Sequence, residues 1–205
     1  MTHSAKLQNQ FGNIDIYLYD QLLKGRFDHV KTVLDAGCGG GRNLVYFLAN
    51  GFDVFAVDQS PAAVAAVRRL AASLAPALSA DHFEVARLED LPHPGESFDA
   101  VICNAVLHFV TDEAQFDRIM TELWRVLRPG GIFFARLSSV IGLENRLRLI
   151  EGRRYQLPDG SELFLVDEAK LMAVTANLGA SLLDPLKTTN VQNLRCMTTW
   201  TLRKA

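Results

Sequence analysis

The chain has 205 residues, 49% of them hydrophobic and 21% charged, and 21 lysines and arginines against 23 aspartates and glutamates give a formal net charge of -2. This length and apolar content predict a single folded domain over residues 1–205 and argue against disorder. The near-neutral charge argues against a nucleic-acid partner, and the longest uncharged stretch, 171–183, is too short for a membrane span.

The cysteines and the N-terminal residues bear on where the protein works. Cys38, Cys103 and Cys196 are far apart and odd in number, so they form neither a disulfide framework nor a C-x-x-C metal site. The segment Met1–Gln10 is polar and lacks the apolar core of a signal peptide. We therefore expect a cytoplasmic protein with no metal and no membrane partner.

Apolar runs alternate with helical patterns along most of the chain. Ile14, Leu18 and Leu22, spaced four residues apart, predict a short N-terminal amphipathic helix. The expected strands are Thr32–Ala36, Asp53–Asp58, His82–Leu88, Ser97–Asn104 and Ile132–Leu137. The expected helices are Arg42–Asn50, Pro61–Leu74 and a long one from Thr111-Asp112 to about Leu127, closed by Pro129-Gly130-Gly131. Continuous apolar strands separated by helices predict an α/β fold with a parallel sheet covered on both faces.

The alternation breaks after the fifth strand. Residues 140–165 are interpreted as an insert, in which Asp159-Gly160 predicts a hairpin turn. Acidic residues offset the insert's four arginines, Arg146, Arg148, Arg153 and Arg154. This balance favours a solvated face, with a cap over the pocket that prefers anionic acceptors as the alternative. A helix over Asp167–Asn177 and an antiparallel edge made of Ser181–Leu186 and Cys196–Arg203 are expected to follow.

Four of the 14 glycines lie between Gly37 and Gly41, in an Asp-x-Gly-x-Gly-x-Gly pattern that begins at Asp35. Glycine lets a ligand approach the backbone closely, and parallel sheets bind ligands at the carboxyl ends of their strands. Asp58 ends the second expected strand, where its carboxylate can accept hydrogen bonds from both hydroxyls of a ribose. The pattern favours a nucleotide site over a tight turn with a structural role alone.

The loop departs from the two common phosphate-binding patterns. A dinucleotide fingerprint would place its third glycine at Arg42, and the Gly-Lys pair of a P-loop occurs nowhere in the chain. Asp35 would repel a pyrophosphate, whereas it suits an ammonium or a sulfonium. The loop therefore favours a cationic nucleoside, with an NAD(P)-dependent oxidoreductase of Rossmann fold as the alternative.

Taken in order, these motifs resemble the class I S-adenosylmethionine-dependent methyltransferases over residues 32–138. The matching stretches are VLDAGCGGG (33–41), VFAVDQSP (54–61), EDLP (89–92), SFDAVICNAVLHFV (97–110) and LWRVLRPGGIFF (123–134). The run 37–58 resembles the tellurite-resistance-type and related small-molecule methyltransferases more than the nucleic-acid ones. The resemblance implies a Rossmann-like three-layer sandwich. Its seven-stranded, mostly parallel sheet would have the order 3-2-1-4-5-7-6, with strand 7 antiparallel.

The resemblance also implies S-adenosyl-L-methionine as the cofactor, and a role for each matching position. Asp35 would face the methionine end of the cofactor, and Asp58 would hold the ribose. The backbone or side chains of the other implied positions would line the rest of the cofactor; these are Gly37, Cys38, Gly39, Gln59, Leu88, Glu89, Asn104 and Ala105. Independently of the resemblance, Asn43 and Arg42 open the first helix, where they are either simple surface residues or ligands of the cofactor carboxylate.

One position departs from the family pattern. Many relatives have an acid two places before Glu89, where this chain has Arg87. An arginine cannot accept a hydrogen bond from the adenine amino group. Glu89, a backbone carbonyl or packing alone would then have to hold the adenine.

Methyl transfer from a sulfonium is an SN2 step that depends on alignment, so we expect no obligatory catalytic triad. Three residues are candidates for work on the acceptor. His108 is either a base or a packed structural histidine. Tyr17 either lines the site or packs on the core. Arg136, a charge inside an apolar strand, either pairs with an acid or points into the acceptor pocket.

The acceptor is expected to be a small molecule. After the fourth strand, residues 104–107 (NAVL) lack the Asn/Asp-Pro-Pro-Tyr loop of methyltransferases that act on adenine or glutamine amino groups. In relatives the N-terminal segment often closes over the cofactor, so residues 1–30 are expected to form a helical lid. A non-catalytic cofactor-binding protein stays open as an alternative, and both a monomer and a homodimer are compatible with the sequence.

Overall fold

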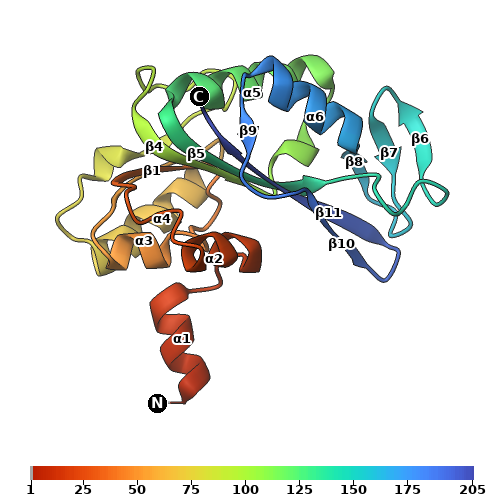
Figure 1. Ribbon diagram of the computed structural model, residues 1–205. Helices are drawn as coiled ribbons and strands as arrows, with labels where there is room; N and C mark the ends of the chain where they lie inside the picture. The colour runs from red at the N-terminus through yellow and green to blue at the C-terminus, as the bar shows by residue number, and fades with distance from the viewer. Residues whose placement is uncertain (1) are drawn as a thin grey trace.

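A central β-sheet runs through the protein, and helices cover both of its faces (Figure 1). The computed structural model describes residues 2–205. The strands of this sheet are β1 (Thr32–Ala36), β2 (Asp53–Asp58), β3 (Phe83–Val85), β4 (Phe98–Asn104), β5 (Leu127–Ser138), β9 (Ser181–Leu182), β10 (Lys187–Val191) and β11 (Arg195–Arg203).

The strand order is β10-β11-β5-β4-β1-β2-β3. Neighbours from β3 through β5 pair in parallel, whereas β11 is antiparallel to both β5 and β10. This is the predicted order 3-2-1-4-5-7-6, and the predicted antiparallel strand 7 is β11. The sheet has eight strands instead of the predicted seven, because the piece β9 pairs separately with β11.

The outer edge of the sheet therefore differs from the prediction in one detail. The expected strand Ser181–Leu186 is a strand only over β9, and the main edge strand is β10, further along the chain. Pro185 lies between the two pieces and has no N–H to donate to a ladder. The interruption follows from that missing donor.

The helices form the two outer layers. On one face lie α2 (Ile16–Leu23), α3 (Val45–Ala49) and α4 (Pro61–Leu74), and on the other lie α5 (Glu113–Val126) and α6 (Glu168–Asn177) (Figure 1). Side chains that cap the N-termini of α4, α5 and α6 accept hydrogen bonds from the first turn; they are Ser60, Asp112 and Asp167. The helix α1 (His3–Phe11) is exposed. There are also two short 3-10 helices within residues 2–205, η1 (Ala80–His82) and η2 (Leu107–Phe109).

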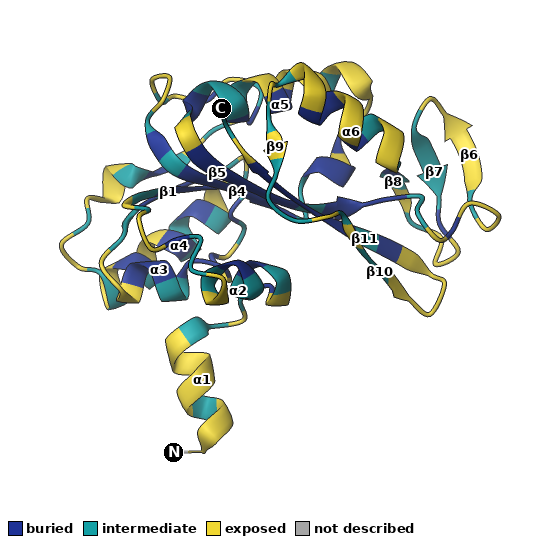
Figure 2. Cartoon of the chain, viewed as in Figure 1, coloured by how far each residue is buried: buried dark blue, intermediate teal, exposed yellow. Residues whose placement is uncertain are grey.

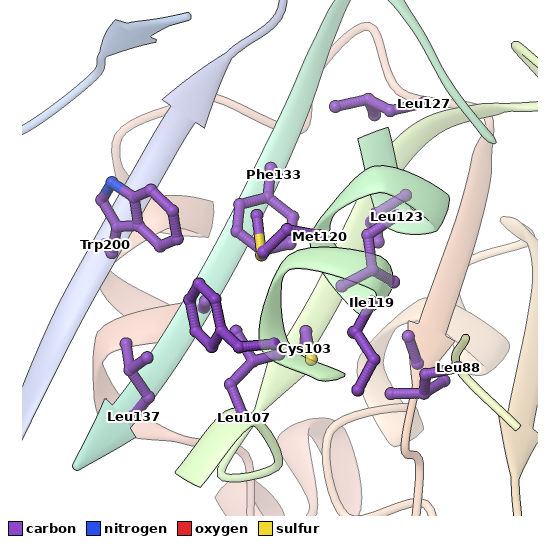
Figure 3. Packing of buried hydrophobic residues seen from close by; sticks show 14 of the residues in the cluster. Leu88, Cys103, Leu107, Ile119, Met120, Leu123, Leu127, Phe133, Leu137 and Trp200 are labelled. Atoms are coloured by element: carbon purple, nitrogen blue, oxygen red, sulfur yellow. The ribbon is translucent and has the colours of Figure 1, made fainter. Parts of the chain in front are cut away.

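Each face of the sheet has its own hydrophobic core, visible as the dark central band of Figure 2. On the face of α5, residues Ile119, Met120 and Leu123 pack toward Phe133 and Cys103 of the sheet (Figure 3). On the opposite face, alternate residues of the same strands contact α3 and α4. Burial on both faces explains why the strands read as continuous apolar runs.

Three elements differ in length from their predictions. The helix expected over Arg42–Asn50 is only α3, because residues 42–44 form a turn. The strand expected over His82–Leu88 is only β3. The closing Pro129-Gly130-Gly131 lies inside β5, at a register shift in the pairing of β4 with β5.

The insert forms a small antiparallel sheet of its own, with strands β6 (Arg148–Glu151), β7 (Arg154–Gln156) and β8 (Glu162–Phe164). The predicted turn is present, with Gly160 at φ +86°. The ring of Phe164 stacks on Phe116 of α5, which holds the insert against the main fold.

Two arginines of the insert form ion pairs. Arg153 binds Glu113 and Asp167 of the main fold, and Arg154 binds Glu162 within the insert. The exposed Arg154 pair favours the solvated-face interpretation for that residue, whereas Arg153 joins the insert to α5 and α6. Within residues 2–205, no helix is long and apolar enough to cross a membrane.

Candidate functional site

A pocket of about 340 Å³ opens where the carboxyl ends of β1, β2 and β4 meet. The predicted cofactor positions that line it are Gly37, Gly39, Asp58, Gln59, Leu88, Glu89 and Ala105. The sequence prediction missed other lining residues, namely Ala86, Val106, Val110, Gln115 and Ile119. The topology thus brings positions from three separate loops to one cavity, as expected for the carboxyl edge of a parallel sheet.

The glycine loop lies against this pocket, and two of its glycines have different reasons for being glycine. Gly37 has φ +80°, and a Cβ there would lie 2.5 Å from Cγ2 of Val106. Gly39 has φ +50°, and a Cβ there would meet nothing within 4 Å. Gly37 is therefore required by packing, whereas Gly39 presents bare backbone to the pocket.

Asp58 is held in place by the loops on either side of it. The N–H of Gly39 donates to Oδ2 at 2.9 Å, and the N–H of Ser60 donates to Oδ1 at 2.9 Å. Each carboxylate oxygen keeps further acceptor capacity, because it has more than one lone pair. The carboxylate therefore lines the pocket already oriented and still able to accept hydrogen bonds from a ligand.

Two predicted residues, Asp35 and Asn104, are buried beside the pocket and do not line it. Asp35 is 1% exposed and Asn104 7% exposed. Within residues 2–205, Oδ2 of Asp35 and both side-chain polar atoms of Asn104 have no hydrogen-bond partner. Burial raises the pKa of Asp35 to about 7, the nearby Asp58 carboxylate adds to that rise, and Arg42 opposes it. Such unpaired buried groups are costly, which points to a ligand or water at this place.

Cys38 and Asn43 are likewise near the pocket without lining it. Burial raises the pKa of the Cys38 thiol, so this side chain stays neutral and is not a nucleophile. Oδ1 of Asn43 accepts a hydrogen bond from the backbone N–H of Asp15 at 3.0 Å. Asn43 thus connects the glycine loop to the start of α2, and its predicted contact with the cofactor carboxylate stays a prediction.

Arg87, the residue that departs from the family pattern, lines the pocket. Its guanidinium lies in solvent and donates to Oε1 of Glu89 at 2.9 Å, and Gln115 donates to the same oxygen at 2.6 Å. Burial raises the pKa of Glu89, but hydrogen bonds from Arg87 and Gln115 outweigh it and leave the pKa below its usual range. Glu89 is therefore an ionised hydrogen-bond acceptor in the pocket lining, and Arg87 helps to hold it there.

The sequence contains a pattern that indicates the position of Gln115 at the start of α5. This residue lies three residues after the helix cap Asp112, whose Oδ1 accepts from the Gln115 N–H, and Oε1 of Gln115 accepts from the N–H of Thr111. A capping residue followed three places later by Glu or Gln is a known helix-start pattern. Ile119 follows one turn later on the same helix face.

The backbone after β4 forms another wall of the pocket. Ala105 has φ +61°, which is unfavourable for a residue with a Cβ. Its N–H donates to the carbonyl of Arg136, which helps to hold this conformation. Phe109 lines the pocket and is 70% exposed, so its aromatic ring is accessible to a ligand at the pocket surface.

The structure places the three candidates for work on the acceptor outside the pocket lining. His108 is buried, and its Nδ1 accepts from the N–H of Ser138 at 3.3 Å. Burial lowers the pKa of His108 to about 4, so the imidazole is neutral at pH 7. This arrangement matches the packed structural histidine better than the base.

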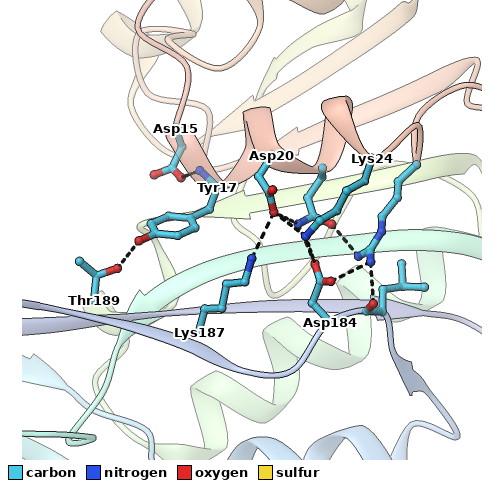
Figure 4. A network of polar contacts seen from close by, with 10 residues as sticks. Asp15, Tyr17, Asp20, Lys24, Asp184, Lys187 and Thr189 are labelled. Atoms are coloured by element: carbon cyan, nitrogen blue, oxygen red, sulfur yellow. Dashed lines mark hydrogen bonds and ion pairs between the residues drawn. The ribbon is translucent and has the colours of Figure 1, made fainter.

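Tyr17 and Arg136 contact each other. The guanidinium of Arg136 lies 5.0 Å from the centre of the Tyr17 ring, and its Nη1 donates to Oδ2 of Asp15 at 3.0 Å. Arg136 therefore pairs with an acid, which was one of its two predicted alternatives. The Tyr17 hydroxyl forms a hydrogen bond with the hydroxyl of Thr189 on β10 (Figure 4).

Comparison with known proteins identifies the domain that contains this pocket. A family model described as a methyltransferase domain matches residues 34–135, about half of the chain. Residues 34–135 are a class I S-adenosylmethionine-dependent methyltransferase domain. This methyltransferase domain contains the end of β1, all of β2 to β4, the first part of β5 and every residue that lines the pocket.

Individual relatives extend the comparison. The chain is 36% identical over 111 residues to malonyl-[acyl-carrier protein] O-methyltransferase of Salmonella typhimurium, a match covering 54% of this chain and 39% of the relative. It is 33% identical over 129 residues to ubiquinone biosynthesis O-methyltransferase of Sodalis glossinidius, covering 58% and 50%. The chain thus spans half or less of the length of these curated relatives.

A solved structure shares the fold of the methyltransferase domain and much of its surroundings. It is 1,6-didemethyltoxoflavin-N1-methyltransferase of Burkholderia thailandensis, with 1,6-didemethyltoxoflavin and S-adenosylhomocysteine bound. The TM-score is 0.68 at 22% identity, over 90% of this chain and 75% of the other. None of these three relatives is named for tellurite resistance, so that subgroup stays a prediction.

Proposed function

We propose that this protein transfers a methyl group from S-adenosylmethionine to a small-molecule acceptor. The observation that carries the proposal is the Asp58 carboxylate, which is held between Gly39 and Ser60 at the edge of the pocket. Its position at the end of β2, beside a glycine loop, suits the two hydroxyls of a ribose. The names of the curated relatives, both O-methyltransferases, support the same reaction.

The residues present fit a cofactor that combines a nucleoside with a positively charged amino acid end. Asp58 would accept from the ribose hydroxyls, and Glu89 would lie near the adenine. Asp35 has a buried oxygen without a partner, which an ammonium group would satisfy. The bare backbone at Gly39 leaves room for close approach.

Bound S-adenosylmethionine supplies a methyl group on a sulfonium, which an acceptor lone pair can attack as the carbon–sulfur bond breaks. The chain's contribution is then to align the two reactants and exclude water. Val106 and Leu88 provide apolar walls for this purpose. His108 is neutral and committed to the Ser138 N–H, so we do not assign it a proton transfer.

The surrounding segments have proposed roles as well. Residues 1–30 serve as a lid, because α2 lies beside the carboxyl edge of the sheet and contacts Arg136 (Figure 4). Residues 140–165 serve as a cap on the acceptor side, because β8 packs against η2. Residues 1–205 would work as one domain in the cytoplasm, as a monomer or a homodimer, on an acceptor that is not a nucleic acid.

Calorimetry with S-adenosylmethionine, S-adenosylhomocysteine and NADH tests the proposal. We expect binding of the two sulfur ligands and no binding of NADH. Binding of NADH alone would favour the oxidoreductase instead. Transfer of a labelled methyl group to a metabolite mixture separates an enzyme from a non-catalytic binding protein, since only an enzyme labels a product.

A further inference from the structure

A row of polar side chains crosses the sheet beneath α2. The pairing register places Asn104 of β4 beside Arg136 of β5, and Arg136 beside Thr199 of β11. Neighbouring residues in register point to the same face of a sheet. That face is the one covered by α2, since Arg136 contacts both Asp15 and Tyr17 there. We call Asn104, Arg136 and Thr199 the polar row.

The polar row is buried and poorly satisfied by the protein. Asn104 and Thr199 are 7% and 5% exposed. The Asn104 amide oxygen and nitrogen, Nε of Arg136 and the Thr199 hydroxyl lack hydrogen-bond partners anywhere in residues 2–205. Each unpaired buried group costs free energy, and here three neighbouring strands contribute such groups side by side. A shared polar partner would satisfy them together.

The chemistry of these atoms favours an anionic partner. The Asn104 amide, Nε of Arg136 and the Thr199 hydroxyl can all donate hydrogen bonds. Asp15 accepts from both Arg136 and Arg42, so two guanidinium groups share one buried carboxylate. A carboxylate on a ligand suits the row, because its two oxygens can accept charge-assisted hydrogen bonds from several donors.

The polar row adjoins one wall of the pocket. Asn104 directly precedes Ala105, which lines the pocket, and the Ala105 N–H donates to the Arg136 carbonyl. The row therefore begins next to this pocket wall and extends from there beneath α2. Contacts from Asp15, Tyr17 and Asp20 hold α2 over this region (Figure 4).

We propose that the polar row binds a carboxylate group of the methyl acceptor, so that the substrates are small molecules carrying such a group. This inference rests on the proposed function. It assigns Asn104, Arg136 and Thr199 to substrate selection, and it gives the unpaired atoms a common partner. The carboxylate is bound, and no covalent step is assigned to the row.

Two threonines of β11 provide a matched pair for the test. Thr199 and Thr201 are both buried with unpaired hydroxyls, two residues apart on the same face. Thr199 lies beside Arg136, whereas Thr201 lies beside the apolar Phe134. Replacing either by valine removes only an unpaired hydroxyl, so both variants are expected to fold at least as stably as the parent.

The experiment titrates the protein, saturated with S-adenosylhomocysteine, with benzoate and with benzamide, which has the same shape without the charge. Calorimetry measures affinity, and NMR follows the Asn104 side-chain amide. We expect benzoate to bind at least about tenfold more tightly than benzamide and to shift the Asn104 signal. Thr199→Val should weaken benzoate binding about tenfold, and Thr201→Val should leave it unchanged.

Other outcomes separate this inference from the proposed function. If S-adenosylhomocysteine binds but benzoate and benzamide bind equally or not at all, the carboxylate site is wrong and the cofactor assignment stands. Equal weakening of benzoate binding by Thr199→Val and Thr201→Val would also contradict the carboxylate site. If S-adenosylhomocysteine fails to bind, the proposed function is wrong, and the benzoate titration of the free protein still decides the carboxylate site.

Discussion

Asp15 and Arg136 are 121 residues apart in the sequence, yet Oδ2 of one accepts a hydrogen bond from Nη1 of the other at 3.0 Å. The contact joins the N-cap of α2 to strand β5 near its carboxyl end. Arg42 also donates to Asp15, and the Asp15 N–H donates to Asn43. One buried carboxylate thus connects the N-terminal helix, the glycine loop and the sheet.

Asp15→Asn should lower the free energy of unfolding by about 2–4 kcal/mol, because it leaves Arg136 partly buried without its charge partner. Asparagine remains a good N-cap, so loss of the ion pair is what the variant measures. Urea unfolding followed by circular dichroism provides the value. The control is Asp20→Asn, whose partly exposed pairs with Lys24 and Lys187 should contribute less than about 1 kcal/mol. Equal losses in the two variants would contradict the role given to Asp15.

Asp58→Ala should weaken binding of S-adenosylhomocysteine by about 1.5–3 kcal/mol, as expected for lost hydrogen bonds to a charged group. Calorimetry checks this value. Asp53 begins the same strand and lies at the opposite edge of the sheet, so Asp53→Ala is the matched control and should bind normally. Unchanged affinity in Asp58→Ala would refute the ribose assignment.

The two pocket glycines should respond differently to alanine. Gly37→Ala should lose about 2–3 kcal/mol of stability, since its Cβ would clash with Val106 and its φ is positive. Gly39→Ala should lose less stability and should instead weaken cofactor binding, because its Cβ would enter open space at the pocket. Thermal unfolding and calorimetry on both variants separate the effects. Val106→Ala added to Gly37→Ala should restore part of the stability, and failure to do so would argue against the clash.

Asp35 should make the free protein less stable as the pH rises. Its pKa is raised from 3.8 to about 7, mainly by burial, so the folded state keeps a proton that the unfolded state releases. The resulting stability is fully present below pH 3.8 and is lost as the pH rises through about 7. In Asp35→Asn this contribution should be absent. Urea unfolding at pH 5 and pH 8 should show a drop of up to about 2.6 kcal/mol in the parent, and a smaller drop in the variant. Identical pH dependence of both proteins would show that Asp35 is ionised throughout.

Elements bounded by strong local signals could be predicted from the sequence. The strands Thr32–Ala36 and Asp53–Asp58 and the helix Pro61–Leu74 have the predicted bounds. Each ends at residues whose preference is local, such as the glycine cluster or the Ser60-Pro61 helix start. The family motifs extended this to the strand order and to half of the residues that line the pocket.

The elements and contacts that the sequence did not predict depend on tertiary contacts. The turn at Arg42 and Asn43 shortens α3, and both side chains bind Asp15, which lies far away in sequence. The edge strand β10 has the polar sequence KTTNV, which carries little hydrophobic signal. Arg136 could not be assigned to a partner, because an ion pair across 121 residues has no periodicity to read.

The contacts of α2 also bear on how the chain is made. Leu18 is fully buried under the fold, and the Tyr17 and Asp20 side chains bind Thr189 and Lys187 near the other end of the chain. A ribosome releases Lys187 only 167 residues after Asp20. Until then α2 cannot complete its docking, so its apolar face stays exposed on the nascent chain. This helix is therefore translated long before it can reach its native position.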